Sequence, residues 1–258
     1  MIFEPFSGVA RLYGAKGLAR LRSCHVMVVG LGGVGGWAVE ALARSGVGTL
    51  TLVDLDEICV SNRNRQVHAL VGQEGRLKTE ALAERISRIN PDCEVKLENR
   101  FMTANSVDAI LGDEDGRATA VIDAIDVVKH KMILLLACRE RGIPLVVSGA
   151  AGGRRDSTQV RSGDLSRTEN DPILATMRKQ LRQKHGFPRV GKGRFGIRCI
   201  YSLEPPIYPT EDGEVSCKAD SRTGLRLNCD FGYGSATPVV AAFGMAAAAE
   251  VLAEIVRE

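Results

Sequence analysis

The chain has 258 residues, of which 45% are apolar and 25% are charged, and its formal net charge at pH 7 is +3. These values are those of an ordinary globular protein and exclude a disordered or fibrous chain. A chain of this length buries a full core as one large domain or two small ones. The weakly basic balance permits a nucleic-acid partner without requiring one, so the distribution of charge matters more than its sum.

The seven cysteines are odd in number and scattered along the chain: Cys24, Cys59, Cys93, Cys138, Cys199, Cys217 and Cys229. No two of them form a C-x-x-C pair, so the sequence has neither the spacing of a zinc ribbon nor that of a redox pair. Isolated cysteines fit a reducing compartment. The first residues also lack the basic, apolar and cleavage-site series of a signal peptide. We therefore expect a cytoplasmic protein.

A membrane span is suggested by one apolar stretch near the end of the chain. The stretch from Ala236 to Ala249 is uncharged, but it has 14 residues and stops at Glu250. A spanning helix needs about 20 apolar residues. We expect a buried helix here, and no transmembrane span.

The first 23 residues are amphipathic and predict a helix that leads into the first strand. Its cations are Arg11, Lys16, Arg20 and Arg22. A helix with one charged face is usually exposed to solvent on that face. Most of this segment is therefore interpreted as a surface helix.

An apolar strand over Val26–Val29 ends in a glycine-rich turn, residues 30–35. A turn of this kind between a strand and a helix lets the backbone approach a phosphate, toward which the helix points its free N–H groups. The pattern from Trp37 to Ser45 suits that helix. The candidate nucleotide-binding glycines are Gly30, Gly32 and Gly33.

A second apolar strand, Thr49–Val53, ends at Asp54, which lies 19 residues beyond Gly35. A dinucleotide-binding fold has its ribose-binding acid at about this spacing. The long polar connection that follows, residues 55–75, is of a length that tends to be functional inside α/β domains. Its candidate nucleotide-binding residues are Asp56, Asn62 and Arg65.

Residues 75–90 have apolar side chains at helical spacing, and Pro91 closes the predicted helix. Lys78 lies in the first turn. A lone cation is unfavourable there, beside the positive end of the helix dipole, unless an anion neutralises it. The position therefore predicts that Lys78 contacts an anionic ligand.

Further strands are predicted over residues 93–97, 118–125 and 145–147, and helices over 106–111 and 129–141. This alternation predicts an α/β fold with a doubly wound, mostly parallel, Rossmann-like sheet. Ligands bind at the carboxyl ends of the strands in such a sheet, and Asp126 lies at the end of the fourth strand. We treat the whole chain, 1–258, as a single domain.

Residues 154–198 differ in composition from the rest of the chain. They contain twelve Lys or Arg residues against four Asp or Glu residues, in a protein whose net charge is only +3. Charge gathered in this way is typical of a surface that binds phosphates, and backbone contacts to tRNA need only well-placed cations. We expect a basic, partly mobile insertion with a helix over residues 171–185, whose cations are Arg178, Lys179, Arg182 and Lys184.

The end of the chain has a simpler pattern. Residues 197–230 predict short strands and loops that hold three of the cysteines. A final C-terminal helix follows, with Ser235 as its expected N-cap and Pro238 in its first turn.

The expected ligand follows from the cations beside the glycine-rich turn. Such a turn is also typical of NAD or FAD enzymes, but hydride transfer needs neither Arg65 nor Lys78. Stabilising pyrophosphate as a leaving group calls for Arg, Lys and Mg²⁺. The sequence therefore favours ATP with Mg²⁺. An NAD-binding regulator or dehydrogenase remains the alternative from another class.

These motifs, in this order, resemble the adenylating enzymes related to ubiquitin-activating enzyme, which include the activators of the molybdopterin and thiamine sulfur carriers. The match runs from the glycine-rich turn through Asn62–Gln66 to Lys78 and Ile89–Pro91. Finer features resemble the tRNA threonylcarbamoyladenosine dehydratase branch over nearly the whole chain: Ala10–Gly14, Asp123–Asp126, Asp171–Pro172, and Cys229 with Phe231–Gly234. Several relatives carry a C-x-x-C zinc site, from which this chain departs.

The resemblance implies catalytic roles for five residues: Arg11, Arg65, Lys78, Asp126 and Cys229. It implies that Arg11 crosses a homodimer interface to the partner's ATP and that Asp126 binds Mg²⁺ on the phosphate side. Val127 stands where family members commonly have Asn or Ser, so one polar contact is expected to be absent.

Two different roles are open to Cys229. Related activators use a cysteine as a covalent acceptor for the adenylated carboxylate, and a thiolate is a competent nucleophile for an acyl phosphate. A ring-closing reaction needs no intermediate on the enzyme, because the acyl group and its attacker share one molecule. We therefore favour a site-shaping role for this cysteine.

The first functional hypothesis is ATP-dependent dehydration of N6-threonylcarbamoyladenosine in tRNA, by adenylation of the threonyl carboxylate and ring closure. The second is adenylation of the C-terminal glycine of a sulfur-carrier protein, which needs the same site but a protein substrate. The basic segment and the absent C-x-x-C pair favour the first. The resemblance also allows a partner from a cysteine-desulfurase-type sulfur system.

Overall fold

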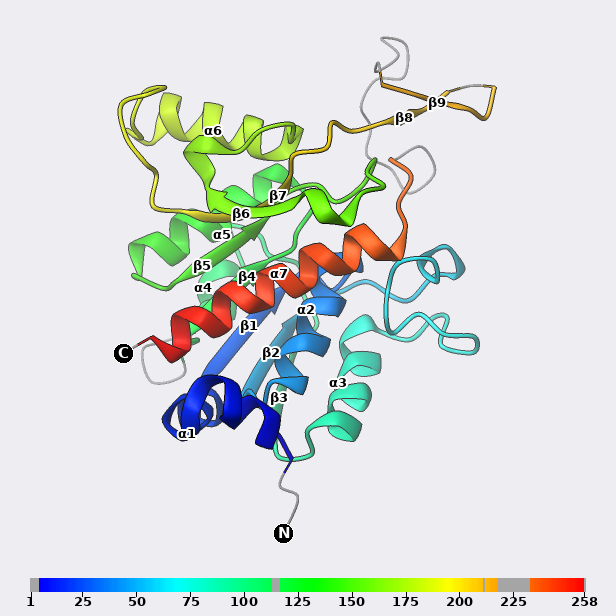
Figure 1. The fold of residues 1–258 in the computed structure, drawn as a ribbon, viewed down its shortest axis with the longest axis vertical. Coiled ribbons are helices and arrows are strands. Elements are labelled where there is room, and N and C mark those ends of the chain that lie inside the picture. Colours follow the sequence, from blue (N-terminus) through cyan, green and yellow to red (C-terminus); the bar gives the residue numbers. More distant parts are fainter. Residues whose placement is uncertain (1–4, 113–116, 211, 218–232, 258) are drawn as a thin grey trace.

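A seven-stranded sheet with strand order β3-β2-β1-β4-β5-β7-β6 forms the centre of the molecule (Figure 1). This computed structural model describes residues 5–112, 117–210, 212–217 and 233–257, so Cys229 lies outside the described residues. Among the described residues, the six neighbouring strands β3, β2, β1, β4, β5 and β7 of this sheet are parallel to one another. Strand β6, at the edge beside β7, is antiparallel to it. The expected doubly wound, mostly parallel sheet is confirmed.

The strands of the main sheet are β1 His25–Val29, β2 Thr49–Val53, β3 Glu94–Glu98, β4 Ala120–Asp123, β5 Leu145–Ser148, β6 Val160–Asp164 and β7 Arg198–Ser202. A separate two-stranded ribbon consists of β8 Tyr208–Pro209 and β9 Val215–Ser216. The α-helices are α1 Ser7–Ser23, α2 Gly33–Arg44, α3 Lys78–Ile89, α4 Val107–Leu111, α5 Val128–Glu140, α6 Pro172–Lys184 and α7 Thr237–Val256. Short 3₁₀ turns cover η1 Val60–Asn62, η3 Ser157–Gln159 and η4 Leu165–Arg167.

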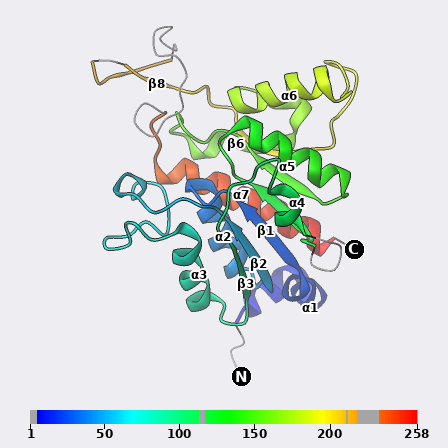
Figure 2. The same cartoon turned by 180° about the vertical axis from the view of Figure 1, so that it is seen from behind.

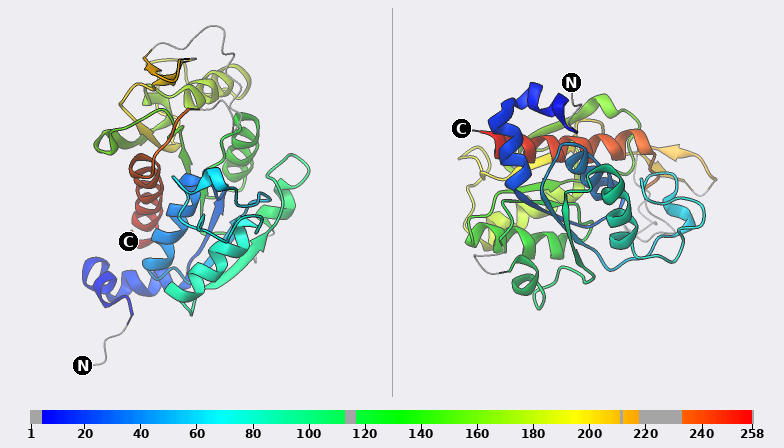
Figure 3. Two further views of the ribbon diagram at one scale, coloured as in Figure 1. Left: turned by 90° about the vertical axis from the view of Figure 1, so that its right-hand side faces the viewer. Right: turned by 90° about the horizontal axis from the view of Figure 1, so that it is seen from below.

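Helices cover both faces of the sheet, because successive side chains of a buried parallel strand point to opposite faces. In β1, Val26 and Val28 join the core under α2, α3 and α7, whereas Met27 and Val29 join the core under α4 and α5. Figure 2 shows α4 and α5 in front of the sheet, and Figure 3 shows the two helical layers on opposite sides. The buried strands therefore read as nearly continuous apolar runs.

Glycines let α7 cross close to α2 on the first of these faces. A Cβ on Gly244 of α7 would lie 2.5 Å from the carbonyl oxygen of Val34, and one on Gly33 of α2 would lie 2.4 Å from Cγ1 of Val240. Neither site accepts a side chain without movement. The close crossing fixes α2, whose first turn carries the glycine-rich motif.

Helix α7 meets the length and hydropathy of a membrane span, with 20 residues and a mean hydropathy of 1.9 in its most apolar window. It is six residues longer than the uncharged stretch in the sequence suggests, because it continues past Glu250. One side of it is buried, with Val239, Phe243 and Val251 fully covered. The described helix thus packs as a core helix of this domain, as expected.

The basic segment contributes a strand to the main sheet in addition to the expected helix. Its residues 160–164 form edge strand β6, which pairs with β7. Helix α6 packs on α5 through an apolar cluster that includes Leu174, Met177 and Leu181. Asp171 accepts a hydrogen bond from the N–H of Leu174, so the sequence-predicted start of α6 is confirmed. Sequence reasoning missed β6 because its composition is charged.

Three predicted helix starts differ from the structure. Helix α3 begins at Lys78, three residues after the expected Gly75. The N-cap of α7 is Ala236 instead of Ser235, and no described side chain caps it. Helix α2 begins at Gly33, four residues before the expected Trp37. The glycine-rich turn carries straight into the helix, which a propensity argument misses because glycine disfavours helix interiors.

Candidate nucleotide site

The turn after β1 brings backbone N–H groups to the carboxyl edge of the sheet. Gly30 has a φ of +87°, a conformation that L-residues rarely adopt, and its Cβ would lie 2.8 Å from the carbonyl oxygen of Ala124. A Cβ on Gly35 would lie 1.8 Å from the carbonyl oxygen of Gly30. Gly32 is the N-cap of α2; no described side chain caps this helix, and its first turn has no acidic residue. The free N–H groups there suit an anion.

Asp54 ties this turn to the end of β2. Its Oδ2 accepts from the N–H of Leu31 at 2.6 Å, and its Oδ1 accepts from the N–H of Asp56 at 2.9 Å. Each oxygen retains further lone pairs for a ribose hydroxyl. Asp54 therefore holds the glycine-rich turn in addition to any contact with a ligand.

Lys78 is buried, being 6% exposed, and its Nζ donates to Oδ2 of Asp56 at 2.8 Å. It is the first residue of α3. Lys78 is therefore not a surface lysine. A cation at the start of a helix requires a neutralising anion. In this structure the carboxylate of Asp56, whose side chain is 53% exposed, neutralises Lys78. A bound phosphate would compete with that carboxylate for the ammonium.

The two ends of the long connection between β2 and α3 are joined to each other. The N–H of Ile58 donates to the carbonyl oxygen of Arg76 at 2.9 Å, and the N–H of Lys78 donates to that of Asp56 at 3.1 Å. An isolated antiparallel bridge between Glu57 and Leu77 lies between them. The connection is thus a closed loop whose neck sets Asp56 against Lys78.

Within this loop, Asn62 shapes the turn that carries Arg65. The Oδ1 of Asn62 accepts from the N–H of Cys59 at 3.0 Å, and its carbonyl oxygen accepts from the N–H of Arg65 at 3.1 Å. The Nε1 of Trp37 donates to the carbonyl oxygen of Arg65. A Cβ on Gly33 would lie 3.6 Å from Cγ of Arg65, so this arginine lies beside the start of α2.

Asp126 is exposed beyond the end of β4, in the turn that lies against Gly30. No three His, Cys, Asp or Glu side chains gather as a metal site anywhere in the described part of the chain. Mg²⁺ in nucleotide enzymes is usually held by one or two carboxylates and the phosphates. One exposed carboxylate beside the glycine-rich turn fits that type of site.

The structure does not bring Arg11 to this edge. Arg11 lies in α1, whose end meets the start of β2, where the N–H of Gly48 donates to the carbonyl oxygen of Leu21. Five strand residues span roughly 16 Å. Helix α1 and the glycine-rich turn therefore lie at opposite ends of the strands, and Arg11 is remote from the site in its own chain.

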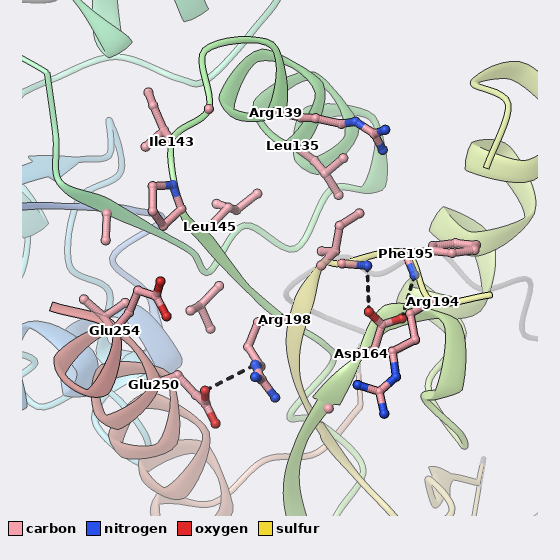
Figure 4. Close-up of a pocket in the computed structure, with 18 of the residues that line it drawn as sticks. Leu135, Arg139, Ile143, Leu145, Asp164, Arg194, Phe195, Arg198, Glu250 and Glu254 are labelled. Atoms are coloured by element: carbon pink, nitrogen blue, oxygen red, sulfur yellow. Dashed lines mark hydrogen bonds and ion pairs between the residues drawn. The ribbon is translucent and has the colours of Figure 1, made fainter. Parts of the chain in front are cut away.

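A pocket of about 820 Å³ also lies at the amino ends of the strands (Figure 4). None of the candidate nucleotide-binding residues lines it. Its charged lining residues are Arg139, Asp164, Arg167, Arg194, Arg198, Glu250 and Glu254. Several of these are already paired: Arg198 lies 3.3 Å from Glu250, and Asp164 accepts from the N–H groups of Phe195 and Gly196. This pocket is thus distinct from the candidate site.

Sequence reasoning missed the buried polar groups behind the site. Lys131 and Asp123 form an ion pair with both side chains 0% exposed. Arg154 is also buried and donates to the carbonyl oxygens of Gly152 and Asn170. The signal in the sequence was Lys131, a charged residue on the side of a predicted helix that faces the sheet. Because Lys and Asp are almost never fully buried unless paired, a lysine there indicates a buried acidic partner.

Comparisons with known proteins agree with this geometry. The model of the ThiF family matches residues 7–258. The chain is 44% identical over 250 residues to the tRNA threonylcarbamoyladenosine dehydratase of Escherichia coli, covering 96% of this chain and 92% of that protein. It is 42% identical over 256 residues to the enzyme of the same name from Haemophilus influenzae, covering 99% and 94%. The resemblance drawn from the motifs is confirmed.

A solved structure extends this similarity to three dimensions. The E. coli tRNA N6-threonylcarbamoyladenosine dehydratase in complex with ATP superposes with a TM-score of 0.84 at 41% identity, covering 97% of this chain and 93% of that one. The fold is therefore shared over nearly the entire length of both chains.

His68, near the site, makes the free energy of unfolding of the protein depend on pH. It is buried beside Gly36, and burial, followed by the charges of Lys78 and Arg85, lowers its pKa from 6.5 to about 4. The unfolded chain thus binds the proton more tightly, so this stability is complete above about pH 6.5 and is lost as the pH falls toward 4. We expect a loss of about 2 kcal/mol between pH 7 and pH 5.

Urea unfolding of the wild type and of His68→Gln at both pH values measures this term. The variant should lose less stability on acidification, by about the same 2 kcal/mol. An equal loss in both proteins would show that His68 is not the group responsible.

Proposed function

The chain belongs to the ThiF family, and on that premise we propose that it dehydrates N6-threonylcarbamoyladenosine in tRNA, using ATP to adenylate the threonyl carboxylate. The observation that carries this proposal is the 44% identity to an enzyme of that name, over 96% of this chain and 92% of the relative. The arrangement of the glycine-rich turn, Arg65, Lys78 and Asp126 at one edge of the sheet supports the ATP chemistry.

In the first step a carboxylate oxygen attacks the α-phosphorus of ATP. The new P–O bond forms as the bond to the bridging oxygen breaks, and pyrophosphate leaves. Negative charge grows on the leaving group, which Arg65 and Lys78 stabilise. When ATP binds, the ammonium of Lys78 would leave Asp56 and pair with the phosphates. Because this ammonium is already buried and oriented, the Lys78 side chain would move little.

In the second step a nucleophilic atom of the same modified group attacks the acyl carbon. The bond to AMP breaks, a ring closes, and the nucleophile loses its proton, so that the elements of water are lost overall. Because attacker and acyl group share one molecule, high effective molarity favours direct closure. We propose that Cys229 shapes the site without forming a thioester.

Mg²⁺ bound at Asp126 would neutralise phosphate charge during adenylation. The exposure of Asp126 and its place beside Gly30 support this role. Gly30, Gly32 and Gly33 would hold the phosphates through backbone N–H groups, and Asp54 the ribose.

The basic segment supplies the proposed tRNA surface. Within α6, Arg178 donates to Oγ1 of Thr168, and the guanidinium of Arg182 lies 5.2 Å from the ring centre of Phe195. These two arginines therefore have structural partners. Lys179 and Lys184 are exposed, which makes them the better candidates for phosphate contacts.

We propose a homodimer in which Arg11 completes the site of the partner. Its remoteness from the site of its own chain supports this arrangement. So do exposed apolar side chains on the first and last helices: Leu12 of α1 is 73% exposed and Met245 of α7 is 40% exposed. Arg20 joins the two helices by donating to the carbonyl oxygen of Val256 at 3.0 Å. A cytoplasmic location and a partner of the cysteine-desulfurase type remain predictions from the sequence.

Pyrophosphate exchange with labelled ATP tests the proposed activity. Exchange should require tRNA that carries N6-threonylcarbamoyladenosine and should be absent with unmodified tRNA. A sulfur-carrier protein with a C-terminal glycine serves as the second substrate. Exchange with the carrier alone would replace the proposed function by the alternative one.

In the same assay, Arg65→Ala should lower the exchange rate by about 10²-fold or more, because it removes a charge that stabilises the leaving group. Arg63→Ala is the matched control, since Arg63 lies two residues away and is paired with Glu74. The control should stay within a few-fold of wild type. Equal losses in the two variants would remove the assignment of Arg65.

The dimer is tested by mixing subunits. Arg11→Ala and Lys78→Ala homodimers should each be inactive, whereas a heterodimer has one site with both residues intact. Each heterodimer should therefore have about half of the activity of a wild-type homodimer, and a random mixture, in which about half of the dimers are heterodimers, about a quarter. Absence of recovery in subunits shown to exchange would refute action across the interface.

The tRNA surface is tested by charge reversal. Lys179→Glu with Lys184→Glu should weaken tRNA binding and flatten its dependence on salt, because fewer counterions are released. Affinity for ATP should be unchanged. Glu169→Gln, also exposed in the basic segment, is a control that removes no cation. An unaltered salt dependence in the double variant would contradict the proposed contact.

A further inference from the structure

Lys131 in α5 is one of the largest fully buried side chains of the described residues, with an exposure of 0%. Its Nζ lies 3.0 Å from Oδ1 of Asp123, which is equally buried at the end of β4. Removing two charges from water costs several kcal/mol per ion, and an apolar pair of similar size is often as stable or more stable. Stability alone therefore does not account for this pair.

The pair holds the backbone of one residue from both sides. The Nζ of Lys131 donates to the carbonyl oxygen of Ile125 at 2.9 Å. The N–H of the same Ile125 donates to Oδ1 of Asp123 at 3.1 Å. Both polar groups of Ile125 are thereby fixed, and Ile125 is the residue that immediately precedes Asp126.

The other side of this turn lies against the glycine-rich motif. A Cβ on Gly30 would be 2.8 Å from the carbonyl oxygen of Ala124 and 3.0 Å from the nitrogen of Ile125. The turn is therefore confined between the phosphate-binding loop and the ammonium of Lys131. Asp126, by contrast, is exposed, so its own packing contributes little to its position.

We propose that Lys131 and Asp123 are positioning residues for adenylation: the buried ion pair fixes the turn at Ile125 and thereby sets the Asp126 carboxylate where phosphate-bound Mg²⁺ meets it. This inference rests on the proposed function, and in particular on the role of Asp126. Neither residue contacts the reacting atoms. Loss of the ion pair frees the turn at Ile125, so that a higher Mg²⁺ concentration is needed for half-maximal adenylation.

The test measures AMP formation with modified tRNA as a function of Mg²⁺ concentration, at saturating ATP and well below the unfolding temperature. Lys131→Met should raise the Mg²⁺ concentration for half-maximal rate at least tenfold and lower kcat. Asp126→Asn should shift it in the same direction. Leu134→Ala is the control, because Leu134 is equally buried in the same helix but lies in an apolar cluster. It should lower the Tm and leave the Mg²⁺ dependence unchanged.

The double variant Asp123→Asn with Lys131→Met distinguishes fixation of the turn from simple neutralisation of two buried charges. It also replaces Lys131→Met in the test if that single variant fails to fold. If the two charges only neutralise each other, the double variant recovers both Tm and Mg²⁺ dependence, and the inference is overturned. If they position the turn, Tm recovers while the Mg²⁺ dependence stays shifted. A wild-type Mg²⁺ dependence in Lys131→Met or in Asp126→Asn also overturns it. An inactive wild type would instead refute the proposed function, on which the inference depends.

Discussion

The candidate site depends on the close contact between the Gly30 turn and the end of β4. Gly30 takes a positive φ and lies where a Cβ would collide with the backbone of Ala124, and Gly35 lies where a Cβ would collide with Gly30 itself. The contact sets the start of α2 against β4 without intervening side chains. Free N–H groups and the turn that carries Asp126 thereby meet at one edge of the sheet.

Beside this contact, a buried cation is paired with a carboxylate that a phosphate could displace. Lys78 is buried and neutralised by the partly exposed Asp56, so its positive charge is oriented without being left unpaired. The loop that separates them in sequence is closed by hydrogen bonds at its neck. Anionic phosphates would replace the carboxylate of Asp56 at Lys78, and the displaced carboxylate would be solvated by water. This arrangement keeps the reorganisation on binding small, which is the basis of electrostatic preorganisation.

Behind the site, polar groups are buried where ordinary domains have apolar ones. Asp123 with Lys131 fixes the turn after β4, and Arg154 fixes the loop after β5 through carbonyl oxygens of Gly152 and Asn170. Such groups are costly unless satisfied, so their presence at the carboxyl edge points to a requirement for fixed backbone there. The amino edge has a pocket of about 820 Å³, in which Arg198 pairs with Glu250 (Figure 4).

The sequence by itself determined the fold class, the glycine-rich turn, and the presence of Asp54, Arg65, Lys78 and Asp126 near it, because local pattern and spacing carry that information. Tertiary structure decided what each side chain touches. Burial of Lys78 against Asp56, edge strand β6 inside a basic segment, and the position of Arg11 at the opposite end of the strands all depend on contacts distant in sequence. Lys131 shows the limit most clearly: periodicity places it in a helix, but only packing of that helix on β4 reveals a buried charge that holds Ile125.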